Sequence, residues 1–190
     1  MRLFVAVNFP IKLRRRIASA TKGLRKLKMP TRWVEPEKLH LTFKFIGEVR
    51  DEKAEELAEA LVRAAGDLRP FEIRFSQVGA FPSLRGPKIV WLGVELTGDL
   101  RFVKHDLEHV FSEVGIERET RAFHPHVTLG RVEGNARAGA FRELERLARQ
   151  IEVEDTYRVS HIDLMRSRLR PGGPEYTAYK VAALGRKTRK

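Results

Sequence analysis

Two short segments of the sequence combine a histidine with a threonine two residues later. They read HLTF at 40–43 and HVTL at 126–129. In both segments apolar residues alternate with the histidine and the threonine, a pattern typical of a half-buried β-strand. Because alternate side chains of a strand point to the same face, each histidine shares a polar face with its threonine. The intervening apolar side chains, with Phe45 after the first segment, are predicted to face the core.

The two polar faces carry the groups that displacement at a phosphorus atom requires. The reference pKa of imidazole is about 6.5, so near neutral pH one histidine can accept a proton from water while the other donates a proton to the departing alkoxide. The hydroxyls of Thr42 and Thr128 can hydrogen-bond a non-bridging phosphate oxygen or orient the water. Lys44 falls on the face of His40 and Thr42, where its charge would offset developing negative charge.

Two spacings in the sequence also occur in metal sites. His124 and His126 form an H-x-H pair, and HDLEH at 105–109 matches an inverted zinc-protease pattern. No acidic or cysteine ligand accompanies the first, and no third ligand marks the second. We therefore predict that 105–109 is a solvent-exposed helix face and that the protein uses no metal and no cofactor.

The elements that must position these residues follow from the spacing of apolar side chains. Strands are predicted at 3–7, 40–46, 71–75, 88–95 and 126–132, with two or three more strands within 151–184. Helices are predicted at 10–29, 51–65 and 99–114, with Gly66 just after the second. A fourth helix is predicted from the cap Asn135 to near Glu152, with Phe141, Leu144 and Leu147 facing inward. This content predicts an α+β fold with antiparallel-rich sheets and helices on the outside.

The order strand, helix, strand, helix occurs twice, over about 3–66 and 88–150. The two histidine motifs occupy corresponding places in these halves. We therefore expect a single domain over 1–184, built from two similar lobes that face each other across a central cleft. Residues 185–190 are predicted to form a basic tail.

Composition limits the classes of function. The chain has 190 residues, with 37 Lys+Arg against 25 Asp+Glu, and its net charge of +12 favours a phosphate polymer as partner. The absence of cysteine excludes disulfides, thiolate zinc sites and a cysteine nucleophile. Few side-chain amides beside abundant Lys, Arg and Glu are typical of a protein made for high temperature. With no secretory signal and no apolar run near the ~18–20 residues that cross a bilayer, we expect a soluble, cytoplasmic monomer.

The sequence around the two motifs resembles that of the two-histidine phosphoesterases. Within that superfamily it is similar to the RNA 2′,3′-cyclic phosphodiesterases, also called 2′-5′ RNA ligases. The resemblance is carried by residues 36–43 with 45–47, 87–93 and 123–131, and it extends to 2–7, 32–34 and the late residues Leu164, Arg166 and Ser167. It therefore covers nearly the whole chain.

The resemblance implies a bilobal fold and hydrolysis of an RNA 2′,3′-cyclic phosphate end to a 2′-phosphate. It also implies reversible joining of that end to a 5′-hydroxyl through a 2′-5′ linkage. It assigns roles residue by residue: His40 as proton donor, His126 as proton acceptor, and Thr42, Thr128 and Arg131 as phosphate contacts.

Strand parity opposes the assignment of Arg131, because Arg131 falls on the apolar face of its strand. Arg131 can reach the phosphate only if the strand ends or bulges at Gly130. Trp33, Trp91 and Phe81 are interpreted as core residues, with stacking on a base as the alternative.

Two other functions remain open at this point. A basic protein could bind RNA in the same groove without catalysing a reaction, although RNA binding alone does not require two matched histidines. Alternatively, the same chemistry could act on a small nucleotide with a cyclic phosphate.

Overall fold

The computed structural model describes residues 1–134, 141–171 and 173–185. Its strands join in one antiparallel sheet with the order β7-β4-β5-β6-β3-β1-β8-β9, and β2 pairs with β6 off this path. The strands are β1 (Arg2–Asn8), β2 (Thr31–Trp33), β3 (His40–Glu48), β4 (Phe71–Phe81), β5 (Ile89–Val94), β6 (His126–Val132), β7 (Thr156–Val159), β8 (His161–Arg170) and β9 (Gly173–Ala183).

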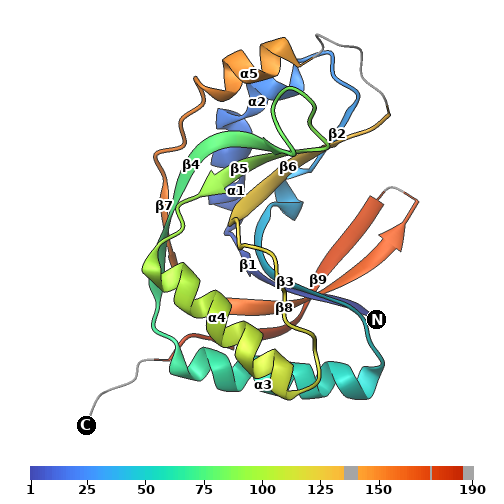
Figure 1. The fold of residues 1–190 in the computed structure, drawn as a ribbon, viewed down its shortest axis with the longest axis vertical. Helices are drawn as coiled ribbons and strands as arrows, with labels where there is room; N and C mark the ends of the chain where they lie inside the picture. Colours follow the sequence, from blue (N-terminus) through green and yellow to red (C-terminus); the bar gives the residue numbers. More distant parts are fainter. Residues whose placement is uncertain (135–140, 172, 186–190) are drawn as a thin grey trace.

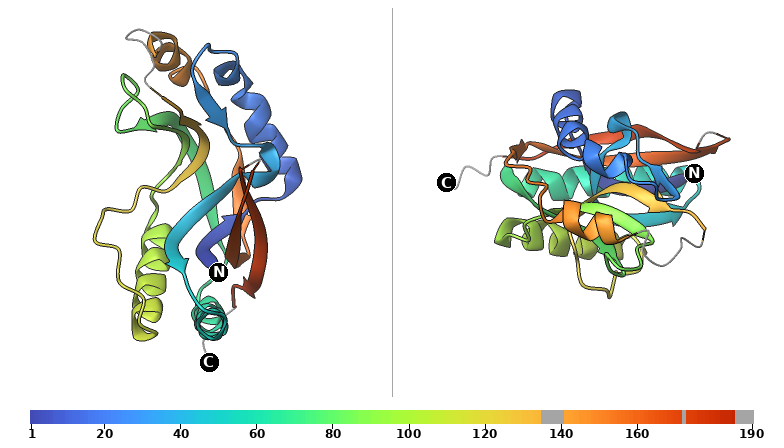
Figure 2. Two further views of the ribbon diagram at one scale, coloured as in Figure 1. Left: turned by 90° about the vertical axis from the view of Figure 1, so that its right-hand side faces the viewer. Right: turned by 90° about the horizontal axis from the view of Figure 1, so that it is seen from above.

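Helices cover the outside of this sheet at its two ends (Figures 1 and 2). α3 and α4 pack together at one end, and α2 and α5 lie together at the other, near α1. The helices are α1 (Ile11–Ala20), α2 (Lys22–Arg25), the 3₁₀ turn η1 (Pro36–Lys38), α3 (Asp51–Asp67), α4 (Gly98–Glu113) and α5 (Arg142–Ala148). The predicted α+β fold with an antiparallel sheet and outer helices is confirmed. Within the described part of the chain, no helix is both long and apolar enough to cross a membrane.

The two histidine strands form the centre of the sheet. β3 and β6 pair with each other, β1 lies on the other side of β3, and β5 lies on the other side of β6. The run of apolar residues that predicted the first strand is buried on both faces of the sheet. Leu3, Val5 and Val7 belong to the main core, and Phe4 and Ala6 pack with Met165 in a second cluster. The internal duplication, the monomeric state and the cytoplasmic location stay predictions.

Element boundaries differ from expectation in several places. The strand predicted at 71–75 extends to Phe81, and β2 was not predicted. The predicted first helix is divided at the buried Thr21, whose hydroxyl donates to the Ile17 carbonyl (2.8 Å), a local bond that competes with regular helix. Gly66 lies inside α3, which ends at Asp67. The last helix begins at Arg142, and the predicted cap Asn135 falls outside the described residues, as does 186–190 of the expected tail.

Candidate active site

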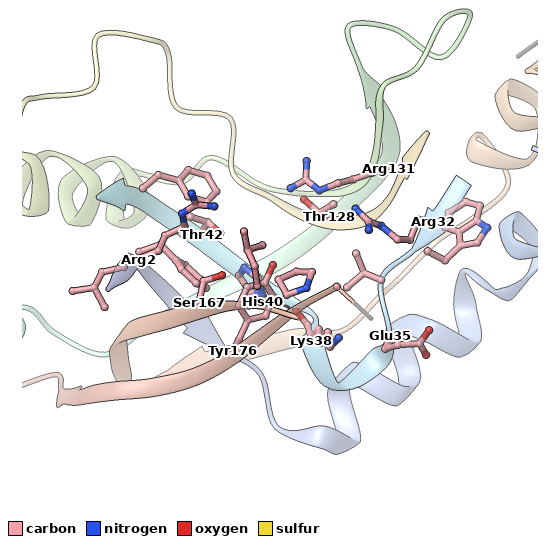
Figure 3. Close-up of a pocket in the computed structure, with 18 of the residues that line it drawn as sticks. Arg2, Arg32, Glu35, Lys38, His40, Thr42, Thr128, Arg131, Ser167 and Tyr176 are labelled. Atoms are coloured by element: carbon pink, nitrogen blue, oxygen red, sulfur yellow. Dashed lines mark hydrogen bonds between the residues drawn. The ribbon is translucent and has the colours of Figure 1, made fainter. Parts of the chain in front are cut away.

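A pocket of about 600 Å³ lies where β1, β2, β3, β6 and the β8–β9 hairpin meet. Of the predicted site residues, His40, Thr42, Thr128 and Arg131 line it. Figure 3 shows Thr128 and Arg131 across the pocket from His40. His126 belongs to the same strand as Thr128 but is not itself part of the lining.

The pairing of β3 with β6 sets the relative positions of the two motifs. Leu41 and Val127, the central residues of the motifs, are partners in the antiparallel ladder. Residues on either side of this pair point to the opposite face of the sheet. In this antiparallel pairing His40 therefore lies opposite Thr128, and His126 lies opposite Thr42. The two histidines are diagonal neighbours, on the order of 7–8 Å apart in a regular ladder, which leaves room for one phosphate between them.

Both imidazoles are held in the same way by the backbone two residues earlier. Nδ1 of His40 lies 2.7 Å from the carbonyl of Lys38, and Nδ1 of His126 lies 2.7 Å from the carbonyl of His124. A carbonyl oxygen only accepts hydrogen bonds, so each Nδ1 carries the proton. In the neutral ring Nε2 is then the nitrogen that can accept a proton.

Each imidazole also packs against two aromatic rings. The centroid of the β3 histidine ring lies 5.1 Å from that of Phe4 and 5.2 Å from that of Tyr176. The β6 histidine ring lies 5.2 Å from Phe81 and 6.1 Å from Trp91. Phe81 and Trp91 thus contact an imidazole. Together with the Nδ1 hydrogen bonds, these rings fix the direction of both Nε2 atoms.

Burial and neighbouring cations keep both imidazoles neutral in the free protein. The pKa of His40 is lowered to about 4, mainly by burial. The backbone hydrogen bond to Lys38 acts in the opposite direction and raises the pKa, while Arg14, His126 and Arg131 lower it further. Burial likewise lowers the pKa of His126, with smaller contributions from Arg131 and His124. A bound phosphate would oppose these cations and raise both pKa values. A donor role for His40 therefore depends on the anion being present.

Both histidine strands bulge one residue after the threonine. Two consecutive residues of β1 face Thr42 and Lys44, so the register skips Phe43. The β5–β6 register skips Leu129 in the same way. A bulge of one residue exchanges the two faces of the strand beyond it. Side-chain directions predicted by simple alternation therefore hold through Phe43 and Leu129 and reverse from Lys44 and Gly130 on.

The bulge in β3 makes the prediction of Lys44 as a substrate contact wrong. Lys44 points to the core, is 4% exposed, and donates to the carboxylate of Glu108 on α4 and to the Glu117 carbonyl (2.8 Å). Phe45, predicted to face the core, is instead 71% exposed and lines the pocket. The physical reason is the extra residue in the strand, which turns Lys44 inward and Phe45 outward.

The bulge in β6 meets the condition set for Arg131. Arg131 is exposed and lines the pocket. Gly130 takes the inward place that Lys44 takes in β3. A Cβ on Gly130 would lie 2.7 Å from Thr31 and from Trp33, closer than real contacts allow. The glycine therefore permits β2 to approach β6 closely beside Arg131.

The structure also brings to the pocket residues to which the sequence analysis gave no role. Tyr176 and Ser167 come from the β8–β9 hairpin, Arg2 from β1 and Arg32 from β2. Each depends on a long-range strand pairing. Trp33, interpreted from the sequence as a core residue, is partly buried and lines the pocket.

The inverted zinc-protease match at 105–109 is not a ligand set. Its Glu108 accepts hydrogen bonds from Lys44 and Lys104, and Nδ1 of His109 lies 3.1 Å from Arg118. No group of three or more His, Cys, Asp or Glu side chains is placed to hold a metal ion within the ranges that the structure describes.

Comparison with known proteins identifies the family of this chain. The family model of the 2′-5′ RNA ligase superfamily matches residues 9–170. The chain belongs to this superfamily. The resemblance inferred from the two motifs is thereby confirmed.

Curated relatives in the superfamily match over most of their length. An RNA 2′,3′-cyclic phosphodiesterase of Methanothermobacter thermautotrophicus is 34% identical over 97% of this chain and 99% of its own. The enzyme of the same name from Aeropyrum pernix is 38% identical over 82% of this chain and 88% of its own. Sources such as these fit the composition expected of a protein made for high temperature.

Solved structures share the same fold. The protein TT0787 of Thermus thermophilus superposes with a TM-score of 0.81 at 28% identity, over 98% of this chain and 100% of its own. Escherichia coli LigT complexed with 3′-AMP superposes with a TM-score of 0.76 at 27% identity, over 96% of this chain and 97% of its own.

Proposed function

We propose that this protein hydrolyses the 2′,3′-cyclic phosphate at the end of an RNA to a 2′-phosphate. The observation that carries the proposal is the matched pair of imidazoles on β3 and β6. Each is anchored through Nδ1 on a backbone carbonyl, so each keeps Nε2 for proton transfer. The names of the curated relatives support the substrate class.

The two histidines divide the proton transfers of an in-line displacement. Nε2 of His126 takes a proton from water as the water oxygen bonds to phosphorus. The bond between phosphorus and the 3′ oxygen breaks, and His40 donates its Nε2 proton to that oxygen. The product is a 2′-phosphate beside a free 3′-hydroxyl. Exchange with solvent returns both histidines to their starting states.

The remaining site residues stabilise the phosphate. The hydroxyls of Thr42 and Thr128 donate to its non-bridging oxygens, and the Arg131 guanidinium offsets charge that develops in the transition state. The bound anion also raises the pKa of His40, which is about 4 in the free protein. Substrate binding thus supplies the condition that lets His40 act as the acid.

The same geometry supports ligation, in which another nucleophile takes the place of water; its reverse is cleavage of a 2′-5′ linkage. A 5′-hydroxyl of a second RNA replaces the water, His126 accepts its proton, and the 3′ oxygen leaves from the His40 side. The result is a 2′-5′ linkage, formed without nucleotide hydrolysis because the cyclic ester supplies the energy.

Turnover of an RNA with a 2′,3′-cyclic phosphate end, by wild type and by His40→Ala and His126→Ala, tests the proposal against a pure binding module. We expect both variants to lose turnover while they still bind a 3′-phosphorylated RNA. His105→Ala, at an exposed position of α4, is the matched control and should keep full activity. If the wild-type protein bound the RNA with a 2′,3′-cyclic phosphate end but did not hydrolyse it, the enzymatic assignment would be refuted.

The size of the substrate needs a separate comparison. A pocket of about 600 Å³ accommodates a terminal nucleotide, so a small cyclic nucleotide is an alternative substrate. We expect kcat/KM for a cyclic-phosphate-ended oligonucleotide to exceed that for a 2′,3′-cyclic mononucleotide. The reverse ranking would favour the small-molecule alternative.

A further inference from the structure

The positive charge of the protein is concentrated at one end of the sequence. Residues 1–34 contain ten Lys and Arg and no Asp or Glu. The other 156 residues are nearly neutral, with 27 Lys and Arg against 25 Asp and Glu. The field of this protein therefore comes largely from β1, α1, α2 and β2, not from a uniform basic surface.

Some of these cations are occupied inside the fold. Arg14 donates to the Glu37 carbonyl and to Asn8, and Arg16 pairs with Asp155 (2.6 Å). Others on α1 and α2, and at the residue after α2, are exposed and have no acidic partner within 4 Å among the described residues. These form what we name the basic stripe: Lys12, Arg15, Lys22 and Lys26.

The basic stripe follows the exposed sides of α1 and α2. Lys12 and Arg15 are three apart at α1, and Lys22 and Lys26 are four apart at α2, which is helical spacing within each helix. Leu13 and Leu24 on the same two helices are buried. The α1–α2 segment covers residues 11–25 with a break at Thr21, so its length is at most roughly 22 Å at about 1.5 Å per residue. At about 3.4 Å per nucleotide of a stacked strand, this corresponds to roughly six nucleotides.

The stripe adjoins the wall of the pocket. The Arg25 guanidinium of α2 lies 5.9 Å from the centroid of Trp33 and donates to the Val34 carbonyl. Trp33 and Val34 both line the pocket, as does Arg32. β2 pairs with β6 alone among the described strands, so it forms a rim between the pocket and α2. Arg25 directly precedes Lys26 in the sequence, so the α2 end of the stripe lies beside this rim.

We propose that the basic stripe binds the sugar–phosphate backbone of the RNA strand that carries the cyclic phosphate. The proposal rests on the proposed function, because it takes the pocket as the place of the RNA end. Four unpaired ammonium and guanidinium groups in a row suit successive phosphates, and their contacts carry no base preference. The stripe would therefore contribute affinity that grows with RNA length and leave the chemical step unchanged.

The test compares two variants that remove the same charge from different places. The stripe variant carries Lys12→Gln, Arg15→Gln, Lys22→Gln and Lys26→Gln. The matched control carries Arg63→Gln, Arg69→Gln, Arg74→Gln and Arg101→Gln, at exposed positions outside the pocket. Glutamine forms helix almost as well as lysine or arginine, so both variants should fold, which thermal unfolding checks.

The readouts are kcat, KM and binding for substrates with the same cyclic-phosphate end and different lengths. For a 2′,3′-cyclic mononucleotide we expect wild type and both variants to agree. For a 16-nucleotide RNA we expect the stripe variant to show a KM raised by roughly tenfold and a salt slope smaller by about 2–3, at roughly 0.7 per lost phosphate contact, with kcat unchanged. In the control variant, the changes in log KM and in the salt slope should be no more than about a third of those in the stripe variant.

Binding of a 3′-phosphorylated 16-nucleotide RNA, measured by fluorescence anisotropy, separates this proposal from the catalytic one. Weaker binding by the stripe variant than by the control supports the stripe even if no substrate is turned over. Equal binding and equal KM for the stripe and control variants at both lengths would overturn it, whatever the activity on cyclic phosphates.

Discussion

Lys44 provides a sharp test of the bulge that arranges one side of the site. The Lys44 ammonium donates to the Glu108 carboxylate and to the Glu117 carbonyl, and Glu108 also accepts from Lys104 and from the Glu119 amide (3.0 Å). Burial would raise the pKa of Glu108, but these hydrogen bonds lower it. The carboxylate is therefore charged and matched to both lysines. We predict that Lys44→Met destabilises the fold and leaves substrate binding unchanged.

The magnitude follows from the groups that Lys44→Met leaves behind. A charge-assisted hydrogen bond contributes about 1.5–3 kcal/mol. Glu117 is an exposed residue, so its carbonyl can bond water when the lysine is removed. Since Glu108 keeps Lys104, a net loss of about 2 kcal/mol is expected, which for a chain of this length corresponds to a fall in Tm of roughly 4–8 °C. Glu108→Gln should cost more, about 3–5 kcal/mol, because it leaves two buried ammonium groups without a counter-charge.

The assay combines thermal unfolding with KM measured well below Tm. Lys53→Met, which breaks the exposed Lys53–Glu56 pair, is the control and should cost under about 1 kcal/mol. We expect Lys44→Met to keep KM within about twofold of wild type. A Tm near the wild-type value together with a strongly raised KM would mean that Lys44 contacts substrate, and would refute the inward orientation.

Three further predictions concern the histidines and metals. The double variant His40→Ala/His126→Ala should be hardly slower than either single variant, because acid and base act as a unit; multiplicative losses in kcat would count against a shared mechanism. Since His40 has a pKa of about 4 when folded and about 6.5 when unfolded, the folded state resists protonation. Stability should therefore fall by about 3 kcal/mol as the pH drops from about 6.5 to 4, as measured by urea unfolding. His40→Gln should lack this component, and an unchanged pH dependence in that variant would contradict the low pKa. Activity should survive exhaustive chelation; loss with EDTA that one divalent ion restores would make His124 and His126 candidate ligands again.

The sequence predicted the central part of the site because strand alternation is a local property. His40, Thr42 and Thr128 share the pocket as alternation requires. The prediction from alternation failed beyond Phe43, at Lys44 and Phe45. The bulge in β3 is set by its pairing with β1, and nothing in the residue types at that place marks an extra residue.

The second bulge could be anticipated only in part. Gly130 offered a signal, since an isolated glycine in a strand often marks a bulge or a close backbone approach, and both occur there. Arg2 and Tyr176 could not be placed from the sequence, because their positions depend on strands paired across most of the chain. The low pKa of His40 likewise comes from burial and from cations of other elements.

The most direct test of the proposed chemistry is the identity of the product end. An RNA ending in a 2′,3′-cyclic phosphate is incubated with the protein, and the terminal phosphate is assigned as 2′ or 3′ by phosphorus NMR against standards. With His40 as donor to the 3′ oxygen and His126 activating water on the opposite side of phosphorus, the product must be a 2′-phosphate. A 3′-phosphate would require the 2′ oxygen to leave toward the acid, and would contradict the roles given to the two histidines.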